Sequence, residues 1–114
     1  MPHLILEHSA ELSRQRDMNA LAKALFEAAL ESGVFGAGKD IKTRTIACDN
    51  VFSGAEPQTF AHLTLRLVAG RPLEVRQKLA NDLLAVLEAH LPEVGTLTVL
   101  PIEIDQDVYA KRVL

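Results

Sequence analysis

Pro2 could act as a base once the initiator methionine is removed, which is expected because a small residue follows Met1. The new terminus would be a secondary amine at the start of an apolar strand, so the sheet would fix its position. A terminal amine has an ordinary pKa near ~8, and a general base works best when its pKa lies close to the ambient pH. Pro2 is therefore a candidate general base. A chain that keeps Met1 has only a tertiary amide at this nitrogen and is expected to be inactive.

Other residues whose types could bind a metal or a nucleotide have simpler structural explanations. No two histidines have a metal-ligand spacing, so we expect surface or sheet-edge positions for His3, His8, His62 and His90. Cys48 is expected to be a small hydrophobic residue at a strand end. Residues 33–39 have the glycine and lysine spacing of a phosphate-binding loop, but Asp40 replaces the Ser or Thr, and the segment precedes a strand instead of a helix. We expect no metal and no nucleotide cofactor.

Composition excludes several further classes of protein. The chain has 114 residues, of which 48% are hydrophobic and 24% charged, as in soluble globular domains. Nucleic-acid binding is disfavoured, because 12 basic residues face 15 acidic ones and only four Phe and one Tyr could stack on bases. The single cysteine cannot form an internal disulfide. We expect no signal peptide, no membrane association and a cytoplasmic protein, because the first residues carry no basic cluster and no long apolar run.

The first half of the chain predicts a strand, a helix and a second strand. Residues 3–7 read as a strand, and a helix follows from an N-cap at Asp17 to a C-terminal glycine at Gly33. Its apolar face follows helical spacing through Ala20, Leu21, Ala24, Leu25, Ala28 and Ala29. The β-branched run 41–48 predicts the second strand, and 53–58 is a loop.

The second half of the chain repeats this order. Residues 61–67 alternate Leu with polar residues and echo residues 2–8. A helix is expected from Pro72 to Pro92, because proline suits the first helical turn and seven apolar residues form a stripe: Leu73, Leu79, Leu83, Leu84, Val86, Leu87 and Leu91. Residues 97–104 predict a fourth strand.

These elements predict a single α+β domain spanning 1–114, with pseudo-repeats at about 2–52 and 61–109. Helices of this length usually connect parallel strands, so two tandem β-α-β units should form a four-stranded mixed sheet with both helices on one face. The strands are so apolar that the second face of the sheet, if left uncovered, would expose an apolar surface prone to association. This pattern favours an oligomer that packs sheet against sheet.

Several segments also carry a specific family resemblance: Pro2-His3, Glu7, 32–35, 41–44, 62–65 and 69–77. The chain resembles the 5-carboxymethyl-2-hydroxymuconate isomerase family of the tautomerase superfamily, which includes 4-oxalocrotonate tautomerase and macrophage migration inhibitory factor. The resemblance covers Pro2 to about Ile104, and its most specific parts are the N-terminal proline and Gly-Arg-x-Leu-Glu-x-Arg-Gln at 70–77. It implies a tautomerase-like homotrimer with a cofactor-free active site around each N-terminal proline.

The resemblance also implies roles for individual residues. Pro2 corresponds to the catalytic base and Arg71 to a substrate-binding arginine. Lys42 stands where the family usually has an arginine, and Arg44 could take that role instead. The implied reaction shifts a proton in an unsaturated 2-hydroxy or 2-oxo di- or tricarboxylate, in the catabolism of aromatic compounds. Cations near Pro2 would disfavour its ammonium form and bind substrate carboxylates.

Two other functions remain open from the sequence. The element order β-α-β-β-α-β is also that of ferredoxin-like domains that bind small molecules, in which Pro2 would be incidental and the molecule dimeric. A tautomerase-superfamily member could also perform a different reaction, such as another keto-enol tautomerisation or a hydrolytic dehalogenation. A trimer in solution would favour the tautomerase over the binding module.

Overall fold

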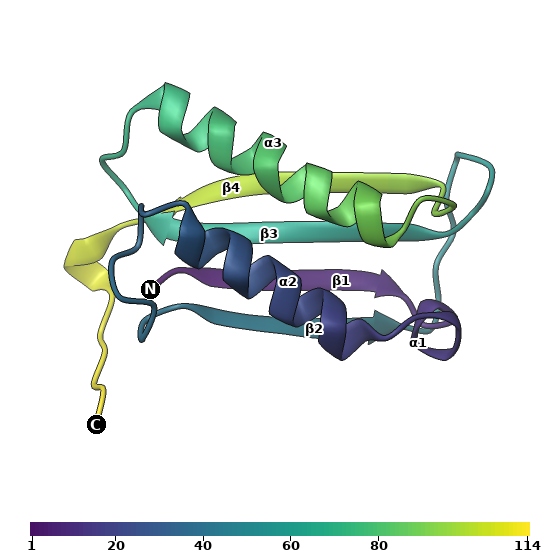
Figure 1. The fold of residues 1–114 in the computed structure, drawn as a ribbon, viewed down its shortest axis with the longest axis horizontal. Helices are drawn as coiled ribbons and strands as arrows, with labels where there is room; N and C mark the ends of the chain where they lie inside the picture. The colour runs from purple at the N-terminus through teal and green to yellow at the C-terminus, as the bar shows by residue number, and fades with distance from the viewer.

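The two central strands of the sheet are β1 (His3–Ser9) and β3 (Phe60–Val68), which pair antiparallel. In the computed structural model, which describes residues 1–114, β2 (Lys42–Cys48) lies parallel to the outer edge of β1. β4 (Thr96–Ile104) lies parallel to the outer edge of β3, so the strand order is β2-β1-β3-β4 (Figure 1). The predicted four-stranded mixed sheet is confirmed.

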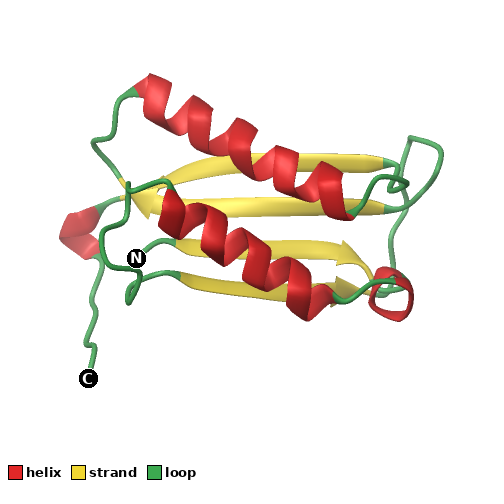
Figure 2. Ribbon diagram, in the orientation of Figure 1, coloured by secondary structure: helices red, strands yellow, loops and turns green.

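Both long helices cover the same face of this sheet, as predicted (Figure 2). α2 (Met18–Glu31) begins at the predicted N-cap, where the Asp17 carboxylate accepts a hydrogen bond from the Ala20 amide at 3.0 Å. Gly33 follows α2 with φ 74°, a conformation that favours glycine. α3 (Leu73–His90) begins directly after Pro72. No helix of the molecule combines the length and the apolar character needed to cross a bilayer.

The core lies between the sheet and the two helices. Strand residues alternate between the two faces of the sheet, and the helix-facing positions of β1 and β3 are fully buried leucines and an alanine: Leu4, Leu6, Ala61, Leu63, Leu65 and Leu67. They pack against the apolar stripes of the helices, which are formed chiefly by Leu21, Leu25, Leu79, Leu83 and Leu87. Burial of this layer fixes the register of the central strands and therefore the position of the residues that precede β1.

The structure corrects the sequence interpretation in three places. His8 is not at the surface or a sheet edge: it faces the helices from a central strand, with 1% exposure, and its Nδ1 lies 2.8 Å from the Ser9 carbonyl oxygen. Two short helices, α1 (Leu12–Gln15) and η1 (Gln106–Val108), were not predicted. Both are too short to show helical periodicity in the sequence.

The strand pairing distinguishes between the two folds that share this element order. In the split βαβ unit of ferredoxin-like domains, another strand separates the two parallel strands that a helix connects. Here β1 pairs directly with β2, and β3 pairs directly with β4. The topology is therefore that of two adjacent β-α-β units, which argues against the ferredoxin-like alternative.

The sheet face opposite the helices is covered by no element of the chain (Figure 2). One register row across it, from β2 to β4, consists of Arg44, Ile5, Thr64 and Leu100. Leu100 is 49% exposed and Ile46, on the same face of β2, is 47% exposed. β3 contributes the polar residues Thr64 and Arg66 of its predicted alternation to this face, so the face combines apolar and polar side chains.

Candidate active site

The two chain termini lie at the same end of the sheet (Figure 1). β1 and β2 are parallel and both start at this end, whereas β3 ends there because it runs antiparallel to β1. Pro2 is buried, and its carbonyl oxygen accepts a hydrogen bond from the Lys42 amide at 3.0 Å. This backbone contact fixes Pro2 beside the first residue of β2.

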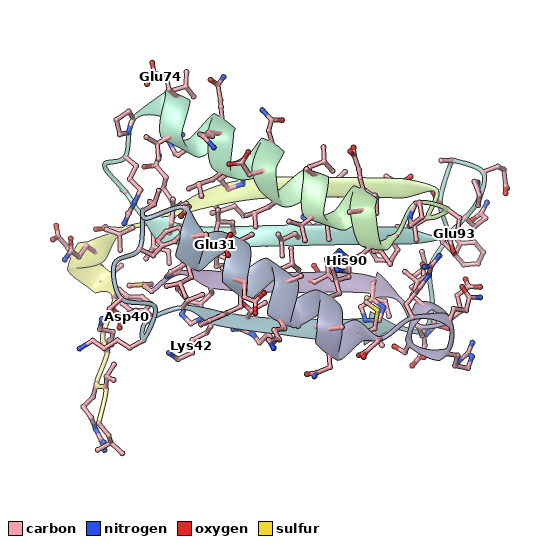
Figure 3. The ribbon with its side chains drawn as sticks, in the orientation of Figure 1. Glu31, Asp40, Lys42, Glu74, His90 and Glu93 are labelled. Carbon is pink, nitrogen blue, oxygen red and sulfur yellow. The ribbon has the colours of Figure 1, made fainter.

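A pocket of about 300 Å³ lies beside the N-terminus, and we call it the N-terminal pocket. Its lining consists of Met1, His3, Asp40, Lys42, Tyr109, Ala110, Lys111, Arg112 and Val113. Figure 3 shows Asp40 and Lys42 at the end of the sheet from which the C-terminal segment descends. Three of the lining side chains are cationic at neutral pH and one is anionic, so the pocket suits an anionic ligand.

The terminal amine in this pocket is shifted toward its neutral form. Burial lowers the pKa of the Met1 amine below its ordinary value, and the nearby cations Lys111, Lys42 and Arg71 lower it further. Asp40 opposes them, because its carboxylate lies 3.8 Å from the amine nitrogen and raises the pKa. A neutral amine can accept a proton, so this environment suits a general base at the chain terminus.

Lys42 and Arg44 lie two positions apart on the same face of β2, but they have different surroundings. Lys42 lines the N-terminal pocket, and its Nζ donates a hydrogen bond to the Lys39 carbonyl oxygen at 2.7 Å. Arg44 does not line that pocket. Its Nη1 donates to His3 Nδ1 at 3.2 Å, and it lines an open groove of about 860 Å³ between α2 and β2, which Lys42 also borders.

Arg71 lies near the terminal amine but does not line the N-terminal pocket. Its Nη1 donates to the Val68 carbonyl oxygen at 2.9 Å and its Nη2 donates to the Val34 carbonyl oxygen at 3.3 Å. The guanidinium carbon also lies 5.3 Å from the centre of the Phe35 ring. Arg71 therefore joins the loop after α2 to the end of β3, and it retains further N–H donors that these two contacts do not use.

Sequence reasoning missed five polar residues of the pocket: His3, Asp40, Tyr109, Lys111 and Arg112. His3 Nε2 lies 2.9 Å from the Tyr109 hydroxyl oxygen, across 106 positions of sequence. The proximity of His3 to Arg44 follows from the parallel pairing of β1 with β2, so this contact could have been predicted from the sequence. No sequence signal indicated that the C-terminal segment returns to the N-terminus.

Comparisons with known proteins agree on one family. The model of the family described as 5-carboxymethyl-2-hydroxymuconate isomerase matches residues 2–110. A 5-carboxymethyl-2-hydroxymuconate Delta-isomerase from Escherichia coli is 27% identical over 109 residues, which cover 93% of this chain and 86% of that protein. The match begins at Pro2 and includes the C-terminal segment as far as residue 110.

Solved structures show the same architecture. A 5-carboxymethyl-2-hydroxymuconate isomerase from Deinococcus radiodurans R1 has a TM-score of 0.83 and 27% identity, covering 97% of this chain and 88% of that one. A fused 4-OT protein described as a symmetric trimer has a TM-score of 0.73 at 16% identity, covering 92% of this chain and 88% of that one. The second likeness concerns the fold alone.

Proposed function

Since the chain belongs to the 5-carboxymethyl-2-hydroxymuconate isomerase family and is an enzyme with the tautomerase fold, we propose that it shifts a proton within an unsaturated 2-hydroxy or 2-oxo di- or tricarboxylate. The observation that carries this proposal is the N-terminal pocket, where the partly buried Met1 amine, one residue before the buried Pro2, lies among a surplus of cations. The substrate class corresponds to the catabolism of aromatic compounds.

In the proposed mechanism Pro2 is the general base. Removal of Met1 converts its nitrogen from a tertiary amide into a basic secondary amine. The neutral amine takes a proton from the enol hydroxyl or an adjacent carbon of the substrate, and the resulting ammonium returns that proton to another carbon. Removal of the first proton leaves a dienolate, whose negative charge is stabilised by the surrounding cations. This sequence of steps requires no metal and no organic cofactor.

The cations have two tasks in this proposal. They favour the neutral form of the amine, and they bind the substrate carboxylates. Lys42 is the better candidate for the second cationic role, because it lines the N-terminal pocket whereas Arg44 is engaged with His3. Arg71 would bind a carboxylate through the N–H groups that its two backbone contacts leave free.

We also propose that the active protein is a homotrimer that packs through the open face of the sheet. The exposed Ile46 and Leu100 support this proposal, because apolar side chains on an uncovered sheet face favour burial against another copy. The trimeric state described for the fused 4-OT structure adds support from the shared fold. The partner would be another copy of this chain, with no nucleic acid or membrane involved.

Replacement of Pro2 tests the proposed base. We expect Pro2→Ala to lower kcat/KM by at least about tenfold, because a primary amine replaces the secondary one while Met1 is still removed. The assay follows ultraviolet absorbance with a panel of 2-hydroxymuconate-type acids and phenylenolpyruvate. Pro92→Ala, an exposed proline at the opposite end of the molecule, is the matched control.

Intact mass of the purified protein completes this test. The active chain should lack one methionine residue. Full activity in a sample in which every chain retains Met1, or unchanged turnover in Pro2→Ala, would refute the role of Pro2.

A further inference from the structure

The C-terminal segment 109–113 forms one wall of the N-terminal pocket. Five of the nine lining residues belong to it: Tyr109, Ala110, Lys111, Arg112 and Val113. The segment follows η1 and contains no helix or strand, so its position depends on individual side-chain contacts instead of a backbone ladder. The contacts that hold this wall therefore determine the composition of the pocket.

Two contacts bring the segment to the pocket. The Tyr109 hydroxyl oxygen lies 2.9 Å from His3 Nε2, and the two rings meet at a centroid distance of 6.2 Å. Lys111 Nζ donates to Asp40 Oδ1 at 3.2 Å. The Asp40 carboxylate is also 3.8 Å from the terminal amine, so one carboxylate joins Lys111 to the chain terminus. Asp40 therefore holds the Lys111 ammonium in the lining of the N-terminal pocket, close to the Met1 amine that precedes Pro2.

The charges around the pocket show what Lys111 adds. Lys42 donates to a neutral backbone carbonyl, which leaves its positive charge available to a substrate carboxylate. Arg71 lies near the Met1 amine but outside the pocket lining, and it donates to two other backbone carbonyls. A tricarboxylate presents one anionic group more than these two cations can bind individually. Lys111 and Arg112 are the additional cations of the pocket lining. Of the two, Lys111, which is 43% exposed along its side chain, is the one held by a contact with Asp40.

We propose that Lys111 is a specificity-determining residue that binds the third carboxylate of a tricarboxylate substrate, and that Tyr109 positions it through its contact with His3. Asp40 holds the Lys111 ammonium until the carboxylate of the substrate replaces it as the partner of Lys111. This inference rests on the proposed function, because it assigns a substrate class to the same pocket.

Removal of the Lys111 charge is the direct test. Lys111→Met should raise KM for an unsaturated 2-hydroxy tricarboxylate by about tenfold, since a charged hydrogen bond of this kind is lost. KM for the corresponding dicarboxylate should change little. Lys78→Met is the matched control, because Lys78 also pairs with an aspartate, Asp82, but on α3 and outside the pocket. Lys111→Arg should recover most of the affinity.

Tyr109→Phe tests the positioning role separately. Loss of the hydroxyl should raise KM for the tricarboxylate by a smaller factor, because the segment loses its contact with His3. The same substitution should have no further effect on KM in the Lys111→Met background, since Tyr109 acts through Lys111. Additive effects of the two substitutions would overturn the positioning role.

Calorimetric binding of a saturated tricarboxylate, propane-1,2,3-tricarboxylate, separates this inference from the proposed reaction. Weaker binding by Lys111→Met than by Lys78→Met supports the Lys111 site even if the wild-type protein turns over no substrate, an outcome that would refute only the proposed function. The inference is overturned if the two variants behave alike in turnover and binding, or if the wild-type protein does not bind the probe.

Discussion

His3 links the start of β1 to β2 and to the C-terminal segment through Arg44 and Tyr109. Because a guanidinium can only donate, the Nδ1 of His3 must accept from Arg44, and the neutral ring then carries its hydrogen on Nε2 and donates it to the Tyr109 hydroxyl oxygen. Protonation of His3 would place a second donor against Arg44. Burial lowers the pKa of His3 below its ordinary value, and the positive charge of Arg44 lowers it further.

A pH-dependent stability follows from this lowered pKa. In the unfolded chain His3 takes up a proton at its ordinary pKa of about 6.5, whereas the folded chain takes it up only at lower pH. Between these two pKa values the unfolded state binds more protons than the folded state. The free energy of unfolding should therefore fall as the pH decreases from about 6.5 to the folded-state pKa. Urea denaturation from pH 7 to pH 5 should show a weaker decline in His3→Asn than in the wild-type protein. Parallel declines would contradict the His3 contribution.

The site residues that could be predicted from sequence are those that precede or lie within regular elements. Pro2 and Lys42 come together because β1 and β2 are parallel and start at the same edge, which the β-α-β order indicates. The contact of Lys111 with Asp40 had no such basis, because it joins two irregular segments 71 positions apart. The inward contacts of Arg71 depend on the loop conformation after α2, which periodicity does not specify.

Among the elements, the entry into β4 is constrained by the loop before β3. The Gly95 amide donates to Thr59 Oγ1 at 3.0 Å, and the Thr96 amide donates to the Thr59 carbonyl oxygen at 3.1 Å. A Cβ on Gly95 would lie 1.9 Å from the Pro57 carbonyl oxygen, so only glycine fits without movement of the backbone. The sequence predicted the strands themselves and a mixed sheet, but it predicted neither their order nor this close approach between distant loops.

Substitution of Gly95 tests this contact. Gly95→Ala should lower the free energy of unfolding by about 2 kcal/mol or more, because the added methyl group must displace backbone atoms. Gly54→Ala is the matched control, since its Cβ would meet nothing within 4 Å, and it should change the stability by less than about 0.5 kcal/mol. Urea denaturation of both variants measures the difference. Equal stabilities would show that the loop moves aside at little cost.

On the scale of the whole molecule, the two faces of the sheet differ: the helices cover one face, and no element of the chain covers the other. Alternation along the central strands β1 and β3 separates a buried layer that consists mainly of leucines from an outward layer of mixed polarity. The sequence predicted the first layer well, because its leucines are regularly spaced. It also favoured an oligomer that packs sheet against sheet, but it could not place Arg44, Thr64 and Leu100 in one row, because they meet only when all four strands are in register. In the proposed trimer, this row of side chains packs against another copy of the chain.

A charge introduced into that row should disrupt the proposed trimer. Leu100→Glu would place a carboxylate on the open face of β4, where packing against a second copy would have to desolvate it, so the variant should sediment as a monomer. Leu73→Glu is the matched control: Leu73 is 55% exposed, similar to Leu100, but lies at the start of α3 on the helical side. Sedimentation velocity at micromolar concentration should find the wild-type protein and Leu73→Glu as trimers. A monomeric wild-type protein, or a trimeric Leu100→Glu variant, would show that this face is not the interface.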